Sequence, residues 1–219
     1  IIMGAAILLR RGGLSDENAK VVDRIINSGQ RMTRMITQLL AFTRTRLGGG
    51  LTVEPGPSDL GDVCGDVVDE LKSGAAIELD VEGDLTGTWD ADRLAEVLSN
   101  IAGNAIEHAD RGTIVEVKAY ANGAEAVVVE IRNRGAPIPT EVLPFIFEPF
   151  RQARHQDQSK TGNLGLGLYI SYQIVLAHGG TLAAHSFGGT TTFTVHLPRA
   201  RPVTESVADI AANRSTLGA

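Results

Sequence analysis

The chain has 219 residues, of which 43% are hydrophobic and 21% are charged, so it can form one large domain or a medium domain with an appendage. A formal net charge of −6 and an aromatic content of 5% argue against a basic or ring-lined surface for nucleic acid. With one cysteine, Cys64, there is no intramolecular disulfide and no cysteine-based metal cluster. This is typical of a reducing compartment, and we expect a cytoplasmic location.

The chain starts with an apolar run, residues 1–9, that is far shorter than the roughly 20 residues of a membrane span. It has neither an initiator Met nor a basic leading segment, so we interpret it as the end of a helix rather than a signal peptide. The cations and glycines of residues 10–13 are typical of a helix C-terminus. We therefore expect no membrane segment here, and a chain that begins partway through a larger protein.

A second, longer helix is predicted from Ser15 or Asp16 to about Arg46, a stretch without proline. Residues 22, 25, 29, 32, 36 and 39 follow a heptad repeat, and further apolar residues widen the stripe beyond a two-stranded seam. A hairpin of two helices, residues 1–47, cannot bury so wide a face alone. We expect it to pair with a second copy as a four-helix bundle; the alternative is that it packs against its own downstream domain.

Gly48-Gly-Gly50 marks a domain boundary, beyond which residues 48–198 show a mixed pattern of strands and helices. We expect strands at 51–54, 77–81, 114–120, 126–131, 181–186 and 191–197, and helices at 60–71, 91–109 and 168–177. Asn122-Gly123 and Gly188-Gly189 are turn signals for two hairpins. The pattern predicts an α+β fold with a mostly antiparallel sheet, helices on one face and a mobile polar tail over 199–219.

Three polar residues of the 91–109 helix, Asn100, Asn104 and His108, are spaced i, i+4, i+8 and so line one shoulder of its apolar face. Asparagine is a poor residue for a helix interior, so two on one stripe suggest a purpose. Their amide oxygens can ligate Mg²⁺, a hard cation that takes oxygen ligands. The alternative is a solvated polar edge.

Two loops could complete a site around this stripe. Asn133-Arg-Gly-Ala-Pro-Ile138 follows a strand, and its first amide can both donate to and accept from a purine edge. An apolar cluster at 145–150 then leads into a polar segment, 151–161, whose cations include Arg151, Arg154 and Lys160. We interpret that segment as a lid over phosphates. Ordinary surface loops are the alternative for both.

Three glycines, Gly162, Gly165 and Gly167, lead directly into the 168–177 helix. They let the backbone approach a ligand closely, and a helix N-terminus supplies free N–H groups and a positive dipole end. The stretch therefore favours phosphate binding, although glycine-rich turns before helices are also common without any ligand.

Five motifs in this order resemble the N, G1, F, G2 and G3 boxes of sensor histidine kinases: Asn100-x3-Asn104, Asn133-x-Gly135, Phe147-x-Pro-Phe150, Gly162/165-x-Gly167 and Thr190-Thr-Thr-Phe193. The resemblance covers roughly residues 1–198. It implies a Bergerat-type (GHKL) ATP-binding α/β sandwich with a mixed, mostly antiparallel sheet. It also implies a preceding dimerisation and histidine-phosphotransfer hairpin, which ends in Gln38-Leu-Leu-Ala-Phe-Thr-Arg44.

The resemblance also implies residue roles. Asn104 would ligate Mg²⁺ with Asn100 at the same site, Asn133 would bind the adenine amino group, and the glycines would hold the phosphates. Asn100 stands where hydrolysing relatives carry a basic Glu, so we expect slow attack by water. The nucleotide-site residues implied are Asn104, His108, Asn133, Gly135, Ile138, Phe150, Lys160, Gly162, Leu164, Gly165, Leu166, Gly167 and Thr191.

This sequence departs from the family pattern in four places. Asn133 stands where the family usually has Asp, Pro137 replaces a second glycine, and Glu107 replaces a frequent basic residue. The phosphoacceptor motif, a His followed by an acidic residue, Leu, Arg and Pro, is absent, since the first of the five histidines is His108. We therefore expect ATP binding without an acceptor histidine in this chain, which alone should not autophosphorylate.

The resemblance thus predicts the catalytic core of a two-component sensor histidine kinase that uses ATP and Mg²⁺. The γ-phosphoryl group would pass to a histidine upstream of residue 1 and then to an aspartate of a response-regulator receiver domain. One alternative is a nucleotide-binding regulatory or dimerisation module that never catalyses. Another is a related GHKL-type ATPase or serine kinase.

Overall fold

The computed structural model of the protein describes residues 16–46, 51–72, 74–151 and 165–200. Helix α2 (Asp16–Arg46) has the length that its apolar repeat predicts, and a mixed α/β domain follows it. The expected first helix, residues 1–10, and most of the expected tail lie outside the described residues. Among the described residues, no helix is both long and apolar enough to cross a membrane.

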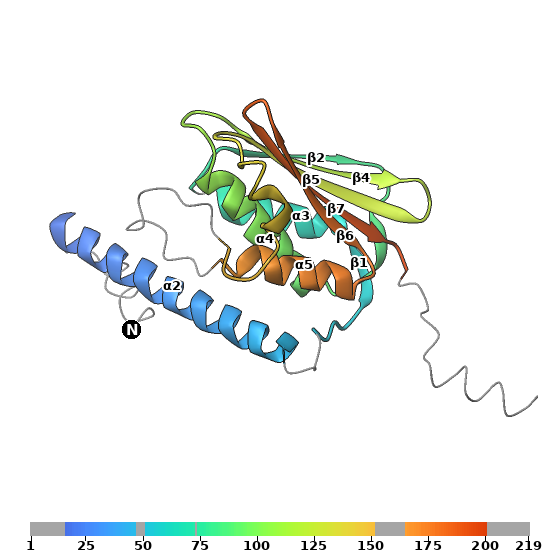
Figure 1. The fold of residues 1–219 in the computed structure, drawn as a ribbon, viewed down its shortest axis with the longest axis horizontal. Helices are drawn as coiled ribbons and strands as arrows, with labels where there is room; N and C mark the ends of the chain where they lie inside the picture. The colour runs from blue at the N-terminus through green and yellow to red at the C-terminus, as the bar shows by residue number, and fades with distance from the viewer. Residues whose placement is uncertain (1–15, 47–50, 73, 152–164, 201–219) are drawn as a thin grey trace, which may run out of the picture.

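The domain is built on a five-stranded sheet with the strand order β2-β4-β5-β7-β6 (Figure 1). The strands are β2 (Ile77–Glu82), β4 (Val115–Asn122), β5 (Ala126–Arg134), β6 (Thr181–Phe187) and β7 (Thr190–Pro198). β2 pairs in parallel with β4, and the other pairs are antiparallel. Gly123 turns one expected hairpin and Gly188-Gly189 the other, all at positive φ, as short hairpin turns require.

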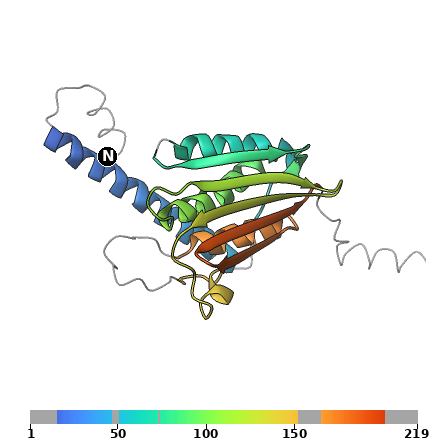
Figure 2. The same ribbon diagram turned by 90° about the horizontal axis from the view of Figure 1, so that it is seen from above.

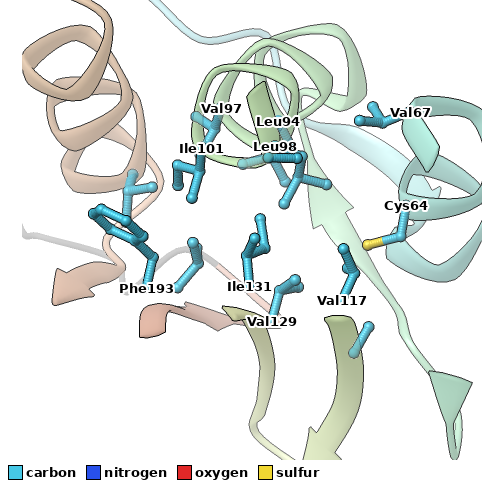
Figure 3. Close-up of a cluster of buried hydrophobic side chains, with 14 of the residues drawn as sticks. Cys64, Val67, Leu94, Val97, Leu98, Ile101, Val117, Val129, Ile131 and Phe193 are labelled. Carbon is cyan, nitrogen blue, oxygen red and sulfur yellow. The ribbon is translucent and has the colours of Figure 1, made fainter. Parts of the chain in front are cut away.

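Helices α3 (Leu60–Lys72), α4 (Ala91–Glu107) and α5 (Gly167–Ala177) all cover the same face of this sheet (Figure 2). Between β5 and α5 the chain makes a short 3₁₀ turn, η1 (Leu143–Phe145). β4 and β7 alternate buried residues with more exposed ones, whereas the first four residues of β5 are all buried, and the inner faces of the strands meet the helices in one apolar core. Val97 and Ile101 of α4 lie over Ile131 of β5 there (Figure 3). These features confirm the predicted α+β sandwich.

Cys64 is fully buried in this core, on α3. Burial raises the pKa of its thiol to about 12, and the nearby Asp59 carboxylate adds to the rise. Since the thiolate is the reactive form, this cysteine is inert at neutral pH. It is a packing residue and takes no part in a site.

The prediction of a strand at Leu51–Glu54 is wrong, because residues 51–55 have no regular structure. The strand is β1 (Gly56–Asp59), which pairs antiparallel with β3 (Thr86–Trp89) in a separate two-stranded sheet. Proline is tolerated at 57 because each strand of a two-stranded sheet has a free edge. The alternating apolar residues at 51 and 53 are partly buried by packing, without strand pairing.

Trp89 anchors this small sheet to the domain. Its indole is buried and its Nε1–H donates to the Pro198 carbonyl oxygen at 2.8 Å. The ring folds back across Gly87, where a Cβ would stand 2.3 Å from a ring carbon. Arg199 closes the same corner: its backbone bonds to Thr88 and Glu125, and its guanidinium donates to carbonyls of the β3 segment. The hydrogen-bonded fold therefore includes Arg199, the first residue of the expected tail.

Helix α2 lies along the helical side of the domain, past α4 and α5 (Figure 1). It touches the domain through Phe42, whose ring is 5.1 Å from the ring of Phe150 and 5.8 Å from that of Tyr169 on α5, centroid to centroid. Both pairs are edge-to-face, the favoured arrangement of aromatic rings. The helix thus packs against the mixed α/β domain at the N-terminal end of α5.

Candidate functional site

Helix α4 presents the expected asparagine stripe beside the core. Asp90 caps the helix by accepting from the Arg93 N–H at 3.1 Å, which fixes where the helix starts and so which residues face the sheet. Asn100 and Asn104 are partly buried, one turn apart, at the edge of the buried face. His108 is exposed at the C-cap, beyond the last helical turn.

The N-terminus of α5 faces this stripe. A Cβ placed on Gly167, the first residue of α5, would stand 3.6 Å from the Asn100 Oδ1 atom, so the glycine backbone and the asparagine amide lie side by side. Leu166 occupies the N-cap position, where its apolar side chain cannot cap the helix. The first-turn N–H groups of α5 therefore point outward without an intrahelical partner, next to Asn100.

Three polar side chains lie at one end of the inner face of the sheet, where the rows of apolar residues on neighbouring strands stop. Asn133 on β5 is 4% exposed and lies opposite Thr191 on β7, which is also buried. Thr191 lies in turn opposite Ser186 on β6, and their hydroxyl oxygens are 2.9 Å apart. These residues continue the inward-facing rows of Ile131, Phe193 and Ala184. The inner face of the sheet is thus apolar along its length and polar at this end.

Ser186 is a site residue that the sequence analysis missed. Its hydroxyl oxygen accepts from the Ile138 N–H at 2.9 Å, so it joins the loop after β5 to the β6–β7 hairpin. The alternation of β6 places residue 186 on the inner face, and the turn at Gly188-Gly189 places it opposite Thr191. Both signals are in the sequence, but they have to be combined to find this residue.

The turn after β5 fits closely against the end of α4. A Cβ on Gly135 would stand 2.1 Å from the His108 carbonyl oxygen, too close for any side chain. The Gly135 N–H donates to the Gly189 carbonyl oxygen at 3.0 Å, and the Asp110 N–H donates to the Arg134 carbonyl oxygen at 2.8 Å. Backbone contacts therefore bring His108, Asn133 and Gly135 together at the polar end of the sheet.

The other residues that the sequence analysis assigned to the nucleotide site differ in burial and in their contacts. Leu166 is fully buried in the core, so its side chain cannot contact a ligand, and only its backbone is available. The Phe150 ring contacts Phe42 of α2, and its N–H donates to the Gly165 carbonyl oxygen at 3.1 Å. Arg151, an expected phosphate-facing cation, pairs with Glu148 at 3.0 Å. Lys160, Gly162 and Leu164, and Arg154 of the expected lid, lie outside the described residues.

Phe150 has an unusual backbone. Its φ is +63°, in the left-handed region that few residues other than glycine adopt, and its ring is more than half exposed. Gly165 is also at positive φ, and a Cβ there would stand 2.7 Å from the Arg151 carbonyl oxygen. The backbone is therefore held tightly where residues 150 and 151 meet Gly165.

The donor set fits a purine nucleotide with a hard cation. A buried amide and hydroxyls at the end of an apolar sheet face can bind and orient a base, and the outward N–H groups of α5 suit phosphate. The Asn104 amide oxygen is a donor that Mg²⁺ accepts, and one such ligand leaves coordination positions for phosphates and water. Among the described residues, no group of three His, Cys, Asp or Glu side chains forms an alternative metal site.

Comparison with known proteins agrees with this geometry. A family model described as "Histidine kinase-, DNA gyrase B-, and HSP90-like ATPase" matches residues 89–201, which contain the asparagine stripe, the glycines and the polar strand ends. A second model, "His Kinase A (phospho-acceptor) domain", matches residues 1–48. The chain belongs to the sensor histidine kinase family.

Curated relatives of this kinase chain are sensor proteins of several bacteria. It is 32% identical over 188 residues to sensor protein VanS of Enterococcus faecium, covering 84% of this chain and 48% of VanS. It is 32% identical over 203 residues to the probable sensor histidine kinase TcrY of Mycobacterium tuberculosis, covering 90% of this chain and 42% of TcrY. The chain thus spans less than half the length of these relatives.

Solved structures of histidine kinases share the fold. Full-length ShkA, crystallised in complex with AMPPNP, superposes with a TM-score of 0.69 at 26% identity, over 92% of this chain and 43% of ShkA. The nucleotide-free catalytic domain of the kinase ThkA superposes with a TM-score of 0.58 at 26% identity, over 67% of this chain and 99% of that domain. These matches confirm the predicted GHKL-type ATP-binding fold.

Proposed function

We propose that this chain is the ATP-binding catalytic core of a two-component sensor histidine kinase that works with MgATP. One observation carries the proposal: the Asn100 amide lies beside Gly167, where the outward N–H groups of α5 begin. Asn133 and Thr191 form the polar end of the inner face of the sheet. This arrangement offers separate places for the two ends of a nucleotide.

Each residue has a defined role in this proposal. Asn133 accepts a hydrogen bond from the adenine amino group through its amide oxygen, which an asparagine can do as well as the aspartate usual in the family. Thr191 and Ser186 hold the polar edge of the base, and the α5 N-terminus holds phosphate oxygens. Asn104 ligates the cation, and Mg²⁺, when bound, neutralises charge on the phosphates.

The protein's contribution to phosphoryl transfer is positioning, because this chemistry needs no protein nucleophile other than the acceptor. The five histidines of the chain lie between His108 and His196, outside residues 1–48, which match the phospho-acceptor domain model. We therefore propose that the phosphoryl group is transferred to a histidine outside these 219 residues, and then to an aspartate of a response-regulator receiver domain. The chain alone should not autophosphorylate. We place the reaction in the cytoplasm.

A calorimetric titration of the chain with a non-hydrolysable ATP analogue in Mg²⁺ tests the nucleotide site. We expect saturable binding that EDTA weakens, because a phosphate-bridging cation is removed. Asn104→Ala should weaken binding about tenfold or more in Mg²⁺ and little in EDTA, while Asn122→Ala, at the exposed end of β4, should bind normally. Absence of nucleotide binding by the unchanged chain would contradict the proposal.

The kinase step needs a second assay, in which a longer chain carrying the acceptor histidine is incubated with MgATP. We expect acid-labile, base-stable phosphate that Asn104→Ala abolishes. Rapid ATP turnover by the 219 residues alone would instead indicate a related ATPase.

A further inference from the structure

Phe42 packs helix α2 against the ATP-binding domain. Phe42 is partly buried between Phe150 and Tyr169, and both of its ring pairs are edge-to-face. Phe150 directly precedes Arg151, which touches Gly165, and Tyr169 lies in the first turn of α5. The contact is therefore at the phosphate end of the proposed site.

One turn before Phe42, on the same face of α2, lies Gln38. Its Nε2 atom is 3.6 Å from the position that a Cβ on Gly167 would take, and the Asn100 Oδ1 atom is 3.6 Å from that same position. Groups from three helices, α2, α4 and α5, thus converge on one point. Gln38 is partly buried there, whereas its neighbour Thr37 is exposed.

The chemistry of this point suits a phosphate group with its bound cation, because N–H donors of Gln38 and α5 stand beside the Asn100 Oδ1 atom, which can accept from water or face the cation. A glutamine amide nitrogen carries two N–H donors and no charge, and the first-turn N–H groups of α5 point into the same space. Arg151, the described cation closest in sequence to Gly165, is engaged by Glu148. An amide from α2 therefore adds a donor where the proposed phosphates lie.

We infer that Gln38 is a nucleotide-site residue contributed by the N-terminal hairpin, so that nucleotide binding and the docking of α2 on the catalytic domain are coupled. The inference rests on the proposed function, because it assigns the ligand at this point as nucleotide phosphate. Coupling is reciprocal: if docked α2 raises nucleotide affinity by some factor, bound nucleotide favours docking by the same factor.

A double-mutant cycle on the whole chain tests this role. Gln38→Glu places a negative charge at the point where the phosphates lie, so it should weaken binding of a non-hydrolysable ATP analogue in Mg²⁺ at least about fivefold, the lower end of known coupling factors. Thr37→Glu makes the same charge change on the exposed side of α2 and should bind within about twofold of the unchanged chain, a margin well below that range.

Phe42→Ala supplies the second arm of the cycle, because it removes the ring that seats α2. In that background Gln38 no longer lies at the site, and Gln38→Glu should change the affinity less than about twofold. Circular dichroism and thermal unfolding of each variant show that the catalytic domain is folded. Neither substitution falls within the five-stranded sheet or its core helices.

The outcomes separate this inference from the proposed function. No binding by the unchanged chain would overturn the proposed function. Normal binding by the unchanged chain with equal affinity in Gln38→Glu would overturn the role of Gln38 alone. An equal loss in Gln38→Glu with and without Phe42→Ala would also overturn it, since the effect would then not depend on docking.

Discussion

Because Gly135 has no side chain, the turn after β5 can pack closely against the end of α4, in the proposed nucleotide site. A Cβ there would meet the His108 carbonyl oxygen at 2.1 Å, a backbone atom that cannot turn away. The turn therefore depends on close contact between two backbones. The amide of Asn133 is also near, with Nδ2 3.4 Å from the same Cβ position.

We predict that Gly135→Ala separates the turn from α4. It should lower the free energy of unfolding by about 2–3 kcal/mol, typical of overpacking in a tight site, and weaken nucleotide binding about tenfold by shifting Asn133. Urea denaturation and calorimetry measure the two effects.

Gly65→Ala is the matched control. A Cβ at Gly65 meets no atom within 4 Å, and the position is inside α3, where alanine is favoured over glycine by about 1 kcal/mol. It should stabilise the chain and leave nucleotide binding unchanged. A Gly135→Ala variant as stable as the Gly65→Ala variant would contradict the contact.

The site residues that the sequence predicts are those whose position follows from one local rule. Helical spacing places Asn100 and Asn104 on one stripe, and the structure has them there. Ser186 escapes the prediction because its role depends on strand register, which joins two elements. Leu166 is buried by the packing of α5, and Phe150 contacts Phe42 because α2 packs against the domain. Neither arrangement follows from a local sequence pattern.

At the scale of elements, the N-terminus of α4 is tied to two other segments through Asp90. Its carboxylate accepts from the Arg93 N–H at 3.1 Å and from the Glu54 N–H at 2.9 Å. Its own N–H donates to Nε2 of His178 at 3.0 Å. The other ring nitrogen therefore carries the proton and donates to the Ile174 carbonyl oxygen at 2.8 Å. The start of α4, the end of α5 and the segment after α2 thus meet at one residue.

Substitution of Asp90 separates these contacts. Asp90→Ala loses the helix cap and the acceptor for Glu54, and we expect it to lower the free energy of unfolding by about 1–2 kcal/mol. Asp90→Asn can still cap the helix through its one amide oxygen but turns an N–H donor toward the Glu54 N–H, so we expect a loss of about 0.5–1 kcal/mol, smaller than that of Asp90→Ala. Urea denaturation of both variants measures the difference, and equal losses would contradict a capping role.

The elements themselves were largely predictable, and the exceptions have a physical reason. The five strands of the main sheet and helices α3, α4 and α5 follow from their apolar periodicity and from glycine turns. β1 does not, because Gly56 and Pro57 are turn residues by local preference, and only pairing with β3 makes them a strand. The alternation at residues 51–54 suggested a strand, but those side chains are buried by packing on the domain.

At the scale of the molecule, α2 offers two different faces. Phe42 and Gln38 face the catalytic domain, whereas four residues of the heptad repeat, Ile25, Met32, Ile36 and Leu39, are exposed. The sequence left two partners open for the apolar stripe, a second copy or the chain's own domain. The structure shows that the domain occupies another face of α2, so the heptad stripe is available for a second copy.

We predict that the stripe forms a homodimer with a four-helix core. Ile36 is 61% exposed, a large apolar side chain that a bundle would bury. Ile36→Glu should place a charge in that core and shift the chain from twice its mass of 23.2 kDa to a single copy at micromolar concentration. Thr37→Glu, the adjacent residue outside the stripe, makes the same charge change and should remain dimeric. Sedimentation velocity distinguishes the two, and an unchanged dimer in Ile36→Glu, or a monomeric unchanged chain, would contradict pairing through this stripe.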